Sequence, residues 1–174
     1  MRIDINNAGR TAAELGLGRA ALTLRAKHKS WQEHPKLDTG ALLWIHDYPV
    51  LLLKLLLLFR PHTYIGSLAT MTREERQAVV TQVSGASLAS IGDWGKVTNG
   101  VAAICYGLLL GVPEIVVAGL SLSKAGHSYD HLARERRQMQ EDAFVLNRLK
   151  DHPRLLTTEA DLANDSGLRL WTGT

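Results

Sequence analysis

Residues 96–129 read KVTNGVAAICYGLLLGVPEIVVAGLSLSKAGHSY and predict one α/β unit. A small polar start at Thr98 is followed by an apolar helix, which Gly111 and Pro113 end. A nearly continuous apolar run over 114–120 then predicts a strand that is covered on both faces. The polar loop after this strand lies where parallel α/β sheets bind their ligands.

The rest of the chain repeats this alternation. Short apolar runs at 41–46, 63–67 and 154–159 predict strands, and helices are expected between them. Residues 12–29 leave a helix as one possibility, although Gly16 and Gly18 weaken it. We therefore predict an α/β class, with a Rossmann-like, doubly wound, mostly parallel sheet in a single domain over residues 1–174.

Composition sets bounds on the function. The 174 residues carry a net charge of +3 and no signal-peptide pattern, and Cys105 is the one cysteine, so a disulfide framework is excluded. We expect Cys105 to be a buried, inert thiol. The run VLLLKLLLLF at 50–59 is too short to span a membrane, so a helix packed on the sheet is expected, with a membrane-facing surface helix as the alternative.

Two groups of polar residues are candidates for a site. Thr98, Asn99 and Gly100 stand at a helix start, where unpaired amides favour an anion, although plain capping is the commoner reason for such residues. The loop after the 114–120 strand adds hydroxyls, a possible base and a phenol, at Ser121, Ser123, His127 and Tyr129. No Walker or GxGxxG motif and no metal-ligand spacing occurs.

The run from Thr98 to Tyr129 resembles the donor-binding core of bacterial sialyltransferases. It matches [Ser/Thr]-x-Gly-Val, an apolar helix, Leu-Gly-x-x-Glu-Ile, an apolar strand ending in Gly, and a loop that reaches Gly-x-Ser-Tyr. The resemblance continues through 142–146 (DAFVL) and 154–159 (RLLTTE), and it covers about the C-terminal half of the chain.

The resemblance implies roles for individual residues. Thr98, Asn99 and Gly100 would contact the CMP part of a CMP-sugar, and the Tyr129 hydroxyl would stabilise the departing phosphate. Asn6, in the stretch IDINN at 3–7, is similar to an asparagine that touches the nucleotide. Neither a metal nor a further cofactor would be needed.

The chain also departs from the family pattern. Ser123 stands where a second tyrosine is expected, and Arg137 or Gln138 stands where the general-base histidine is expected, which leaves His127 or His131 as substitutes. The family's first strand, with its Gly-Asn-Gly-Pro-like turn, has no counterpart. The resemblance thus predicts a domain that is N-terminally incomplete or that has lost catalysis.

Three hypotheses follow. The first is a metal-independent, inverting glycosyltransferase that moves a sialic-acid-like sugar from a CMP-activated donor to a surface glycan such as lipopolysaccharide core. The second is a noncatalytic Rossmann-like domain that at most binds a nucleotide, and the third is another phosphate-transfer enzyme. We expect a cytoplasmic protein without a nucleic-acid partner. Peripheral contact with the inner face of the membrane and homo-oligomerisation stay open.

Overall fold

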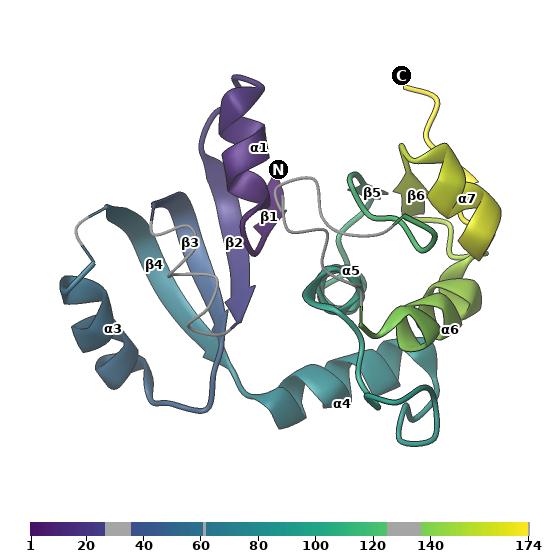
Figure 1. Ribbon diagram of the computed structural model, residues 1–174, viewed down its shortest axis with the longest axis horizontal. Coiled ribbons are helices and arrows are strands. Elements are labelled where there is room, and N and C mark those ends of the chain that lie inside the picture. Colours follow the sequence, from purple (N-terminus) through teal and green to yellow (C-terminus); the bar gives the residue numbers. More distant parts are fainter. Residues whose placement is uncertain (27–35, 61, 125–136, 174) are drawn as a thin grey trace. The chain divides into compact units, whose positions relative to one another are not determined.

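The structure is a computed structural model that describes residues 1–26, 36–60, 62–124 and 137–173 (Figure 1). Contacts between Cα atoms group the chain into two compact units, Met1–Arg76 and Gln77–Thr174, which we call unit 1 and unit 2. Each unit is described by itself. The assignment of residues 1–174 to a single domain therefore stays a prediction.

Unit 1 is built on a parallel sheet of four strands in the order β1-β2-β3-β4. Helices connect β1 to β2 and β3 to β4, as parallel strands require. Its elements in chain order are β1 (Ile3–Ile5), α1 (Ala8–Glu14), β2 (Ala20–Ala26), β3 (Leu37–Ile45), α3 (Val50–Leu58) and β4 (Thr63–Met71).

The core of unit 1 lies between β3 and α3, which Figure 1 places beside the sheet. Leu42 and Trp44 of β3 and Leu53 of α3 have no exposed surface. The leucine-rich run is therefore a helix packed on the sheet, as expected, although most of its leucines remain outside this core. Among the described residues, no helix has the length and apolar composition needed to cross a membrane.

The possible helix over residues 12–29 is wrong. α1 ends at Glu14, and the chain then turns at Gly16, whose φ of +69° suits a residue without a Cβ. Ala20–Ala26 forms β2 instead, between β1 and β3 in the sheet. A strand that pairs on both sides gains its hydrogen bonds from distant segments, so local leucine spacing did not reveal it.

The sequence Thr72-Arg73-Glu74-Glu75 predicts a capping box and a helix that stops at Gly85, and the structure confirms the box at the start of α4 (Arg73–Ser84). The Thr72 amide donates to Glu75 Oε2 at 2.7 Å, and the Glu75 amide donates to Thr72 Oγ1 at 3.1 Å. The helix stops before Gly85, whose φ is +68°, where the sequence predicted its end.

Unit 2 carries a parallel sheet of three strands in the order β5-β6-β7. The α/β class with parallel strands, consistent with a Rossmann-like fold, is confirmed, and the strands belong to two sheets. The elements of unit 2 that follow α4 are α5 (Asn99–Leu109), β5 (Ile115–Val117), α6 (Met139–Leu149), β6 (Leu155–Thr157), α7 (Ala160–Ser166) and β7 (Arg169–Leu170).

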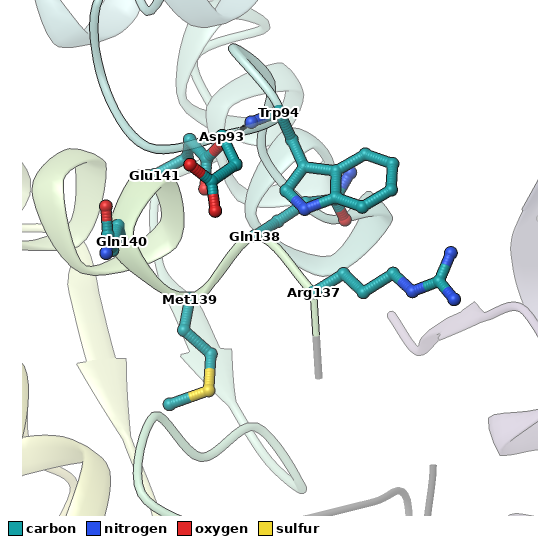
Figure 2. A pocket seen from close by; sticks show the side chains of 7 residues that line it. All are labelled: Asp93, Trp94, Arg137, Gln138, Met139, Gln140 and Glu141. Atoms are coloured by element: carbon teal, nitrogen blue, oxygen red, sulfur yellow. Dashed lines mark hydrogen bonds between the residues drawn. The ribbon is translucent and has the colours of Figure 1, made fainter. Parts of the chain in front are cut away.

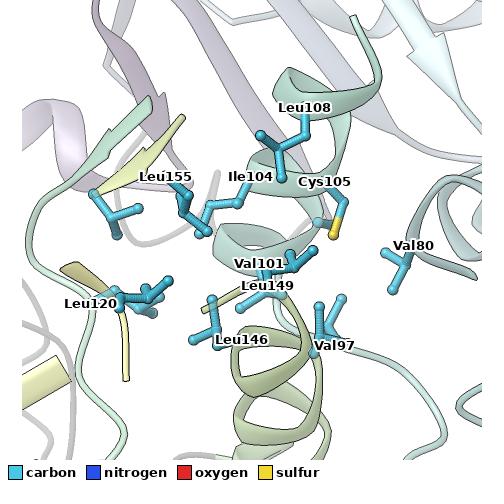
Figure 3. Close-up of a cluster of buried hydrophobic side chains, with 14 of the residues drawn as sticks. Val80, Val97, Val101, Ile104, Cys105, Leu108, Leu120, Leu146, Leu149 and Leu155 are labelled. Carbon is cyan, nitrogen blue, oxygen red and sulfur yellow. The ribbon is translucent and has the colours of Figure 1, made fainter. Parts of the chain in front are cut away.

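The core of unit 2 joins one face of α5 to α6 and the sheet (Figure 3). Val101 and Cys105 of α5, Leu146 of α6 and Leu155 of β6 have no exposed surface. Cys105 is free and buried, as expected, and burial raises the pKa of its thiol to about 12. It therefore stays a neutral thiol at physiological pH.

Candidate functional site

The candidate site begins at the first turn of α5, in unit 2. Thr98 is the N-cap residue, and its hydroxyl oxygen accepts a hydrogen bond from the Val101 amide at 3.5 Å. This is the capping role that the sequence left as an alternative to ligand binding. The amides of Asn99 and Gly100 fall in the first helical turn, where the helix itself offers no acceptor.

A buried carboxylate of α6 holds this turn in place. Asp142 is 2% exposed, and its Oδ1 accepts from the Thr98 amide while its Oδ2 accepts from the Thr98 hydroxyl, each at 2.8 Å. The amide and the hydroxyl of Thr98 are thus both hydrogen-bonded within the protein. Asp142 also places negative charge at the start of α5, which opposes an anion bound close to Thr98.

The start of α5 lies against the chain that leaves β5. A Cβ added at Gly100 would stand 3.7 Å from Leu120 Cδ1, which is an ordinary van der Waals distance. Thr98, Asn99 and Gly100 are each partly exposed, so solid packing does not cover them. The partly exposed helix start therefore lies beside the segment that follows β5.

Ser121 fastens the loop after β5 to the start of α7. Its hydroxyl donates to Asp161 Oδ2 at 2.7 Å and accepts from the amides of Ser123 and Lys124 at 3.3 and 3.0 Å. Lys124 Nζ lies 3.2 Å from the same Asp161 oxygen. The side chain of Ser121 is thus engaged within the protein, whereas Ser123 is exposed.

Changing Ser121 to alanine is expected to raise the pKa of Asp161. The Ser121 hydrogen bond, followed by Lys124, holds this pKa below its ordinary value. A lowered folded-state pKa stabilises the fold above the unfolded-state pKa, and this contribution is lost as the pH falls through the folded value. A carbon NMR titration of the Asp161 carboxyl measures the change. Ser123→Ala is the control, and an unchanged pKa in Ser121→Ala would contradict the assigned cause.

A pocket of about 550 Å³ opens at the start of α6, also in unit 2 (Figure 2). Trp94 is 44% exposed and lies 5.3 Å from the Arg137 guanidinium and 5.7 Å from Lys96 Nζ, measured to its ring centre. Cation–π attraction orients the indole in this position. The residues that line the pocket are Asp93, Trp94, Arg137, Gln138, Met139, Gln140 and Glu141.

The pocket and the start of α5 are held by neighbouring carboxylates. Glu141 is 1% exposed and its Oε1 accepts from the Trp94 amide at 2.7 Å, next to Asp142 and its bonds to Thr98. Both acids lie in the first turn of α6, where the helix dipole stabilises negative charge. The first turn of α6 thus fixes the loop from Trp94 to Thr98 at both ends.

The pocket includes the position where the resemblance expects a general-base histidine. Arg137 and Gln138 both line it. A guanidinium carries hydrogen-bond donors only and a glutamine amide is not basic, so neither residue serves as a general base. A base for the predicted reaction has to come from elsewhere.

The remaining predicted site residues are His127, Tyr129 and Asn6. His127 and Tyr129, and the substitute His131, lie outside the described residues. Asn6 belongs to unit 1, in the turn from β1 to α1, with a φ of +54°. Its amide donates to Leu24 O at 2.8 Å and its carbonyl accepts from Arg25 Nε at 3.0 Å, so its backbone is fixed between β1 and β2.

Sequence reasoning missed the acidic residues that organise the surface. Glu141 was not singled out, and Asp142 was noted only for its resemblance. Glu159, whose Oε1 accepts from the Gly119 amide at 2.9 Å, ended the strand predicted at 154–159, and Asp161 was not singled out. Their partners lie about 40 residues away, so no local spacing pointed to them.

No group of three His, Cys, Asp or Glu side chains suited to a metal ion occurs in the part of the chain that the structure describes. Comparison with protein-family models, with curated proteins and with solved structures finds no match to this chain.

Proposed function

We propose that unit 2 binds the nucleotide of a CMP-activated sugar at the start of α5, and that the protein transfers this sugar, with inversion, to a surface glycan. The observation that carries the proposal is the partly exposed first turn of α5 beside Leu120, at the carboxyl end of a parallel strand. The amides of Asn99 and Gly100 suit a phosphate, while the Asp142 carboxylate on Thr98 opposes one beside that residue. Ligands of open α/β sheets occupy this end.

In the proposed reaction an acceptor hydroxyl oxygen attacks the anomeric carbon of the sugar. The new glycosidic bond forms as the bond from that carbon to the phosphate oxygen breaks, and CMP leaves. The Tyr129 hydroxyl donates a hydrogen bond to the departing phosphate, which lowers the barrier because negative charge grows there. His127 takes the proton of the acceptor hydroxyl.

Product analysis tests the transferase directly. The protein is incubated with a CMP-sugar and a glycan acceptor, and the release of CMP and the formation of the glycoside are followed together. Both are expected, and Tyr129→Phe should lower their rate by about tenfold or more, because one hydrogen-bond donor to the developing charge is lost. Turnover of a nucleoside triphosphate without CMP-sugar turnover would favour another phosphate-transfer enzyme instead.

A noncatalytic, nucleotide-binding domain is the second candidate. Arg137 and Gln138 at the expected base position favour it, because neither residue supplies a base. The engagement of Thr98 and Ser121 by Asp142 and Asp161 withdraws two hydroxyls from the ligand in both candidates. Calorimetric binding of CMP without any product from a CMP-sugar would support this candidate over the transferase.

Changing Gly100 to alanine is expected to weaken CMP binding about tenfold, or about 1.4 kcal/mol, without weakening the fold. A Cβ there would meet Leu120 Cδ1 and Thr98 Oγ1 at 3.7 Å, so it fits, and alanine favours a helix more than glycine does. The added methyl group would instead separate the phosphate from the backbone amides. Calorimetry with CMP measures the affinity and thermal unfolding measures the stability.

Asn99→Ala should also weaken CMP binding, because the Asn99 side chain stands at the same turn. Asn164→Ala changes an exposed asparagine of α7 and serves as the matched control. Wild-type affinity in both Gly100→Ala and Asn99→Ala would place the nucleotide elsewhere.

A further inference from the structure

The helix α3 of unit 1 leaves most of its apolar surface uncovered. Leu53 is its one fully buried residue. Leu51, Leu55 and Leu58 are 72%, 48% and 77% exposed, and Phe59, just after the helix, is 84% exposed. A helix that is apolar on every side is normally buried, so this exposure indicates a missing apolar environment.

Three of the four exposed leucines of α3 share one side of the helix. Positions 51, 55 and 58 are four and three residues apart, so their side chains follow one another along the helix surface. Lys54 is exposed and, at three and four residues from Leu51 and Leu58, belongs to the same side. We call Leu51, Lys54, Leu55, Leu58 and Phe59 the outer face of α3.

The segment that carries this outer face has positive charges only. No Asp or Glu occurs from Tyr48 to Thr72, a stretch that holds Lys54 and Arg60, and the next base, Arg73, pairs with Asp47 at 3.5 Å. Unit 1 contains 11 Lys and Arg against 7 Asp and Glu, a net charge of +4, whereas the whole chain carries +3. The basic excess of the protein thus belongs to the unit that carries the exposed leucines.

We propose that the outer face of α3 docks unit 1 on an anionic phospholipid surface. Nine residues of helix span about 14 Å, less than half of the ~30 Å hydrocarbon layer, so α3 would lie in the plane of the interface. Leucine and phenylalanine side chains enter the acyl boundary, while the Lys54 stem extends its ammonium group to the phosphates. Basic residues around the helix add attraction to anionic lipid.

A second copy of the chain fits this face less well. Stable interfaces bury about 800 Å² on each partner and draw on about 20–30 residues, while the outer face offers four apolar side chains around one lysine. Pairing two such faces would also bring Lys54 of each copy toward the other. Lipid phosphates neutralise the same charge.

Co-sedimentation with vesicles tests the proposal on the full chain. The protein should bind vesicles of mixed phosphatidylcholine and phosphatidylglycerol, and bind pure phosphatidylcholine weakly. Added salt should weaken the binding, because it screens the charged lipid. The double variant Leu51→Glu with Leu58→Glu should lower the affinity by about a hundredfold, since each leucine contributes about tenfold.

The control is Leu15→Glu, which changes a leucine of unit 1 that is 70% exposed and lies outside α3. It should bind the mixed vesicles as the wild type does, and circular dichroism should show all variants folded. Equal binding by the wild type and the double variant, or an equal loss in Leu15→Glu, would overturn the proposal. The proposal would also fail if the wild type did not bind vesicles and sedimentation velocity showed it to be a dimer and the double variant to be a monomer. None of these outcomes depends on CMP.

Discussion

Replacing Leu53 with alanine should destabilise unit 1 by about 3 kcal/mol. Leu53 is the buried residue through which α3 contacts Leu42 and Trp44 of the sheet, and none of the three has exposed surface. Truncating a buried leucine removes its transfer free energy and leaves a cavity, at a cost of about 2–5 kcal/mol. Leu56 and Leu57 also pack against this cluster but are only partly buried, so Leu53 is the deepest contact of α3 with the sheet.

Leu51→Ala provides the matched control, since it makes the same chemical change on the same helix at a residue that is 72% exposed. It should alter stability by less than about 0.5 kcal/mol. Hydrogen exchange of the β3 amides reports on unit 1 separately from unit 2, and it should quicken in Leu53→Ala alone. Similar exchange in the two variants would show that α3 does not rest on the sheet through Leu53.

Replacing Asp142 with alanine should destabilise unit 2 by about 3 kcal/mol. The change removes two hydrogen bonds to a carboxylate that is 2% exposed, and it leaves the amide and hydroxyl of Thr98 without these partners. Hydrogen bonds to charged groups contribute about 1.5–3 kcal/mol each to stability. A buried donor that is left without an acceptor adds its desolvation cost to the loss. Urea unfolding followed through the amides of α5 measures the loss.

Asp93→Ala is the control, because it removes an exposed carboxylate from the loop that leads to α5. A double-mutant cycle sharpens the test: Thr98→Val should cost clearly less in the Asp142→Ala background than in the wild type, since the hydroxyl has already lost its acceptor. Additive effects of the two changes would contradict the direct bond between Asp142 and Thr98.

The sequence predicted the elements whose signals are local. The capping box of Thr72 and Glu75, the stop at Gly85 and the α5–turn–β5 unit rest on residues a few positions apart. Glycine and proline stop signals and side-chain caps act within one helical turn, so nearby residues specify where a helix begins and ends. β5 is shorter than expected and precedes Gly119, whose φ is +71°.

The parts that sequence reasoning missed depend on partners far along the chain. β2 and the short β7 owe their strand form to pairing with neighbouring strands. The bonds from Asp142 to Thr98 and from Asp161 to Ser121 cross 44 and 40 residues. Such pairs carry no periodicity, so the sequence pointed to the start of α5 without revealing which side chains were already engaged there.

The central claim is that the first turn of α5 binds a nucleotide, and titration of CMP into isotope-labelled protein tests it most directly. The proposal predicts saturable shifts of the amide signals of Asn99 and Gly100 and of the loop after Gly119, while the amides of α3 stay unchanged. No shift at Asn99 and Gly100 with millimolar CMP, or shifts confined to other segments, would contradict it.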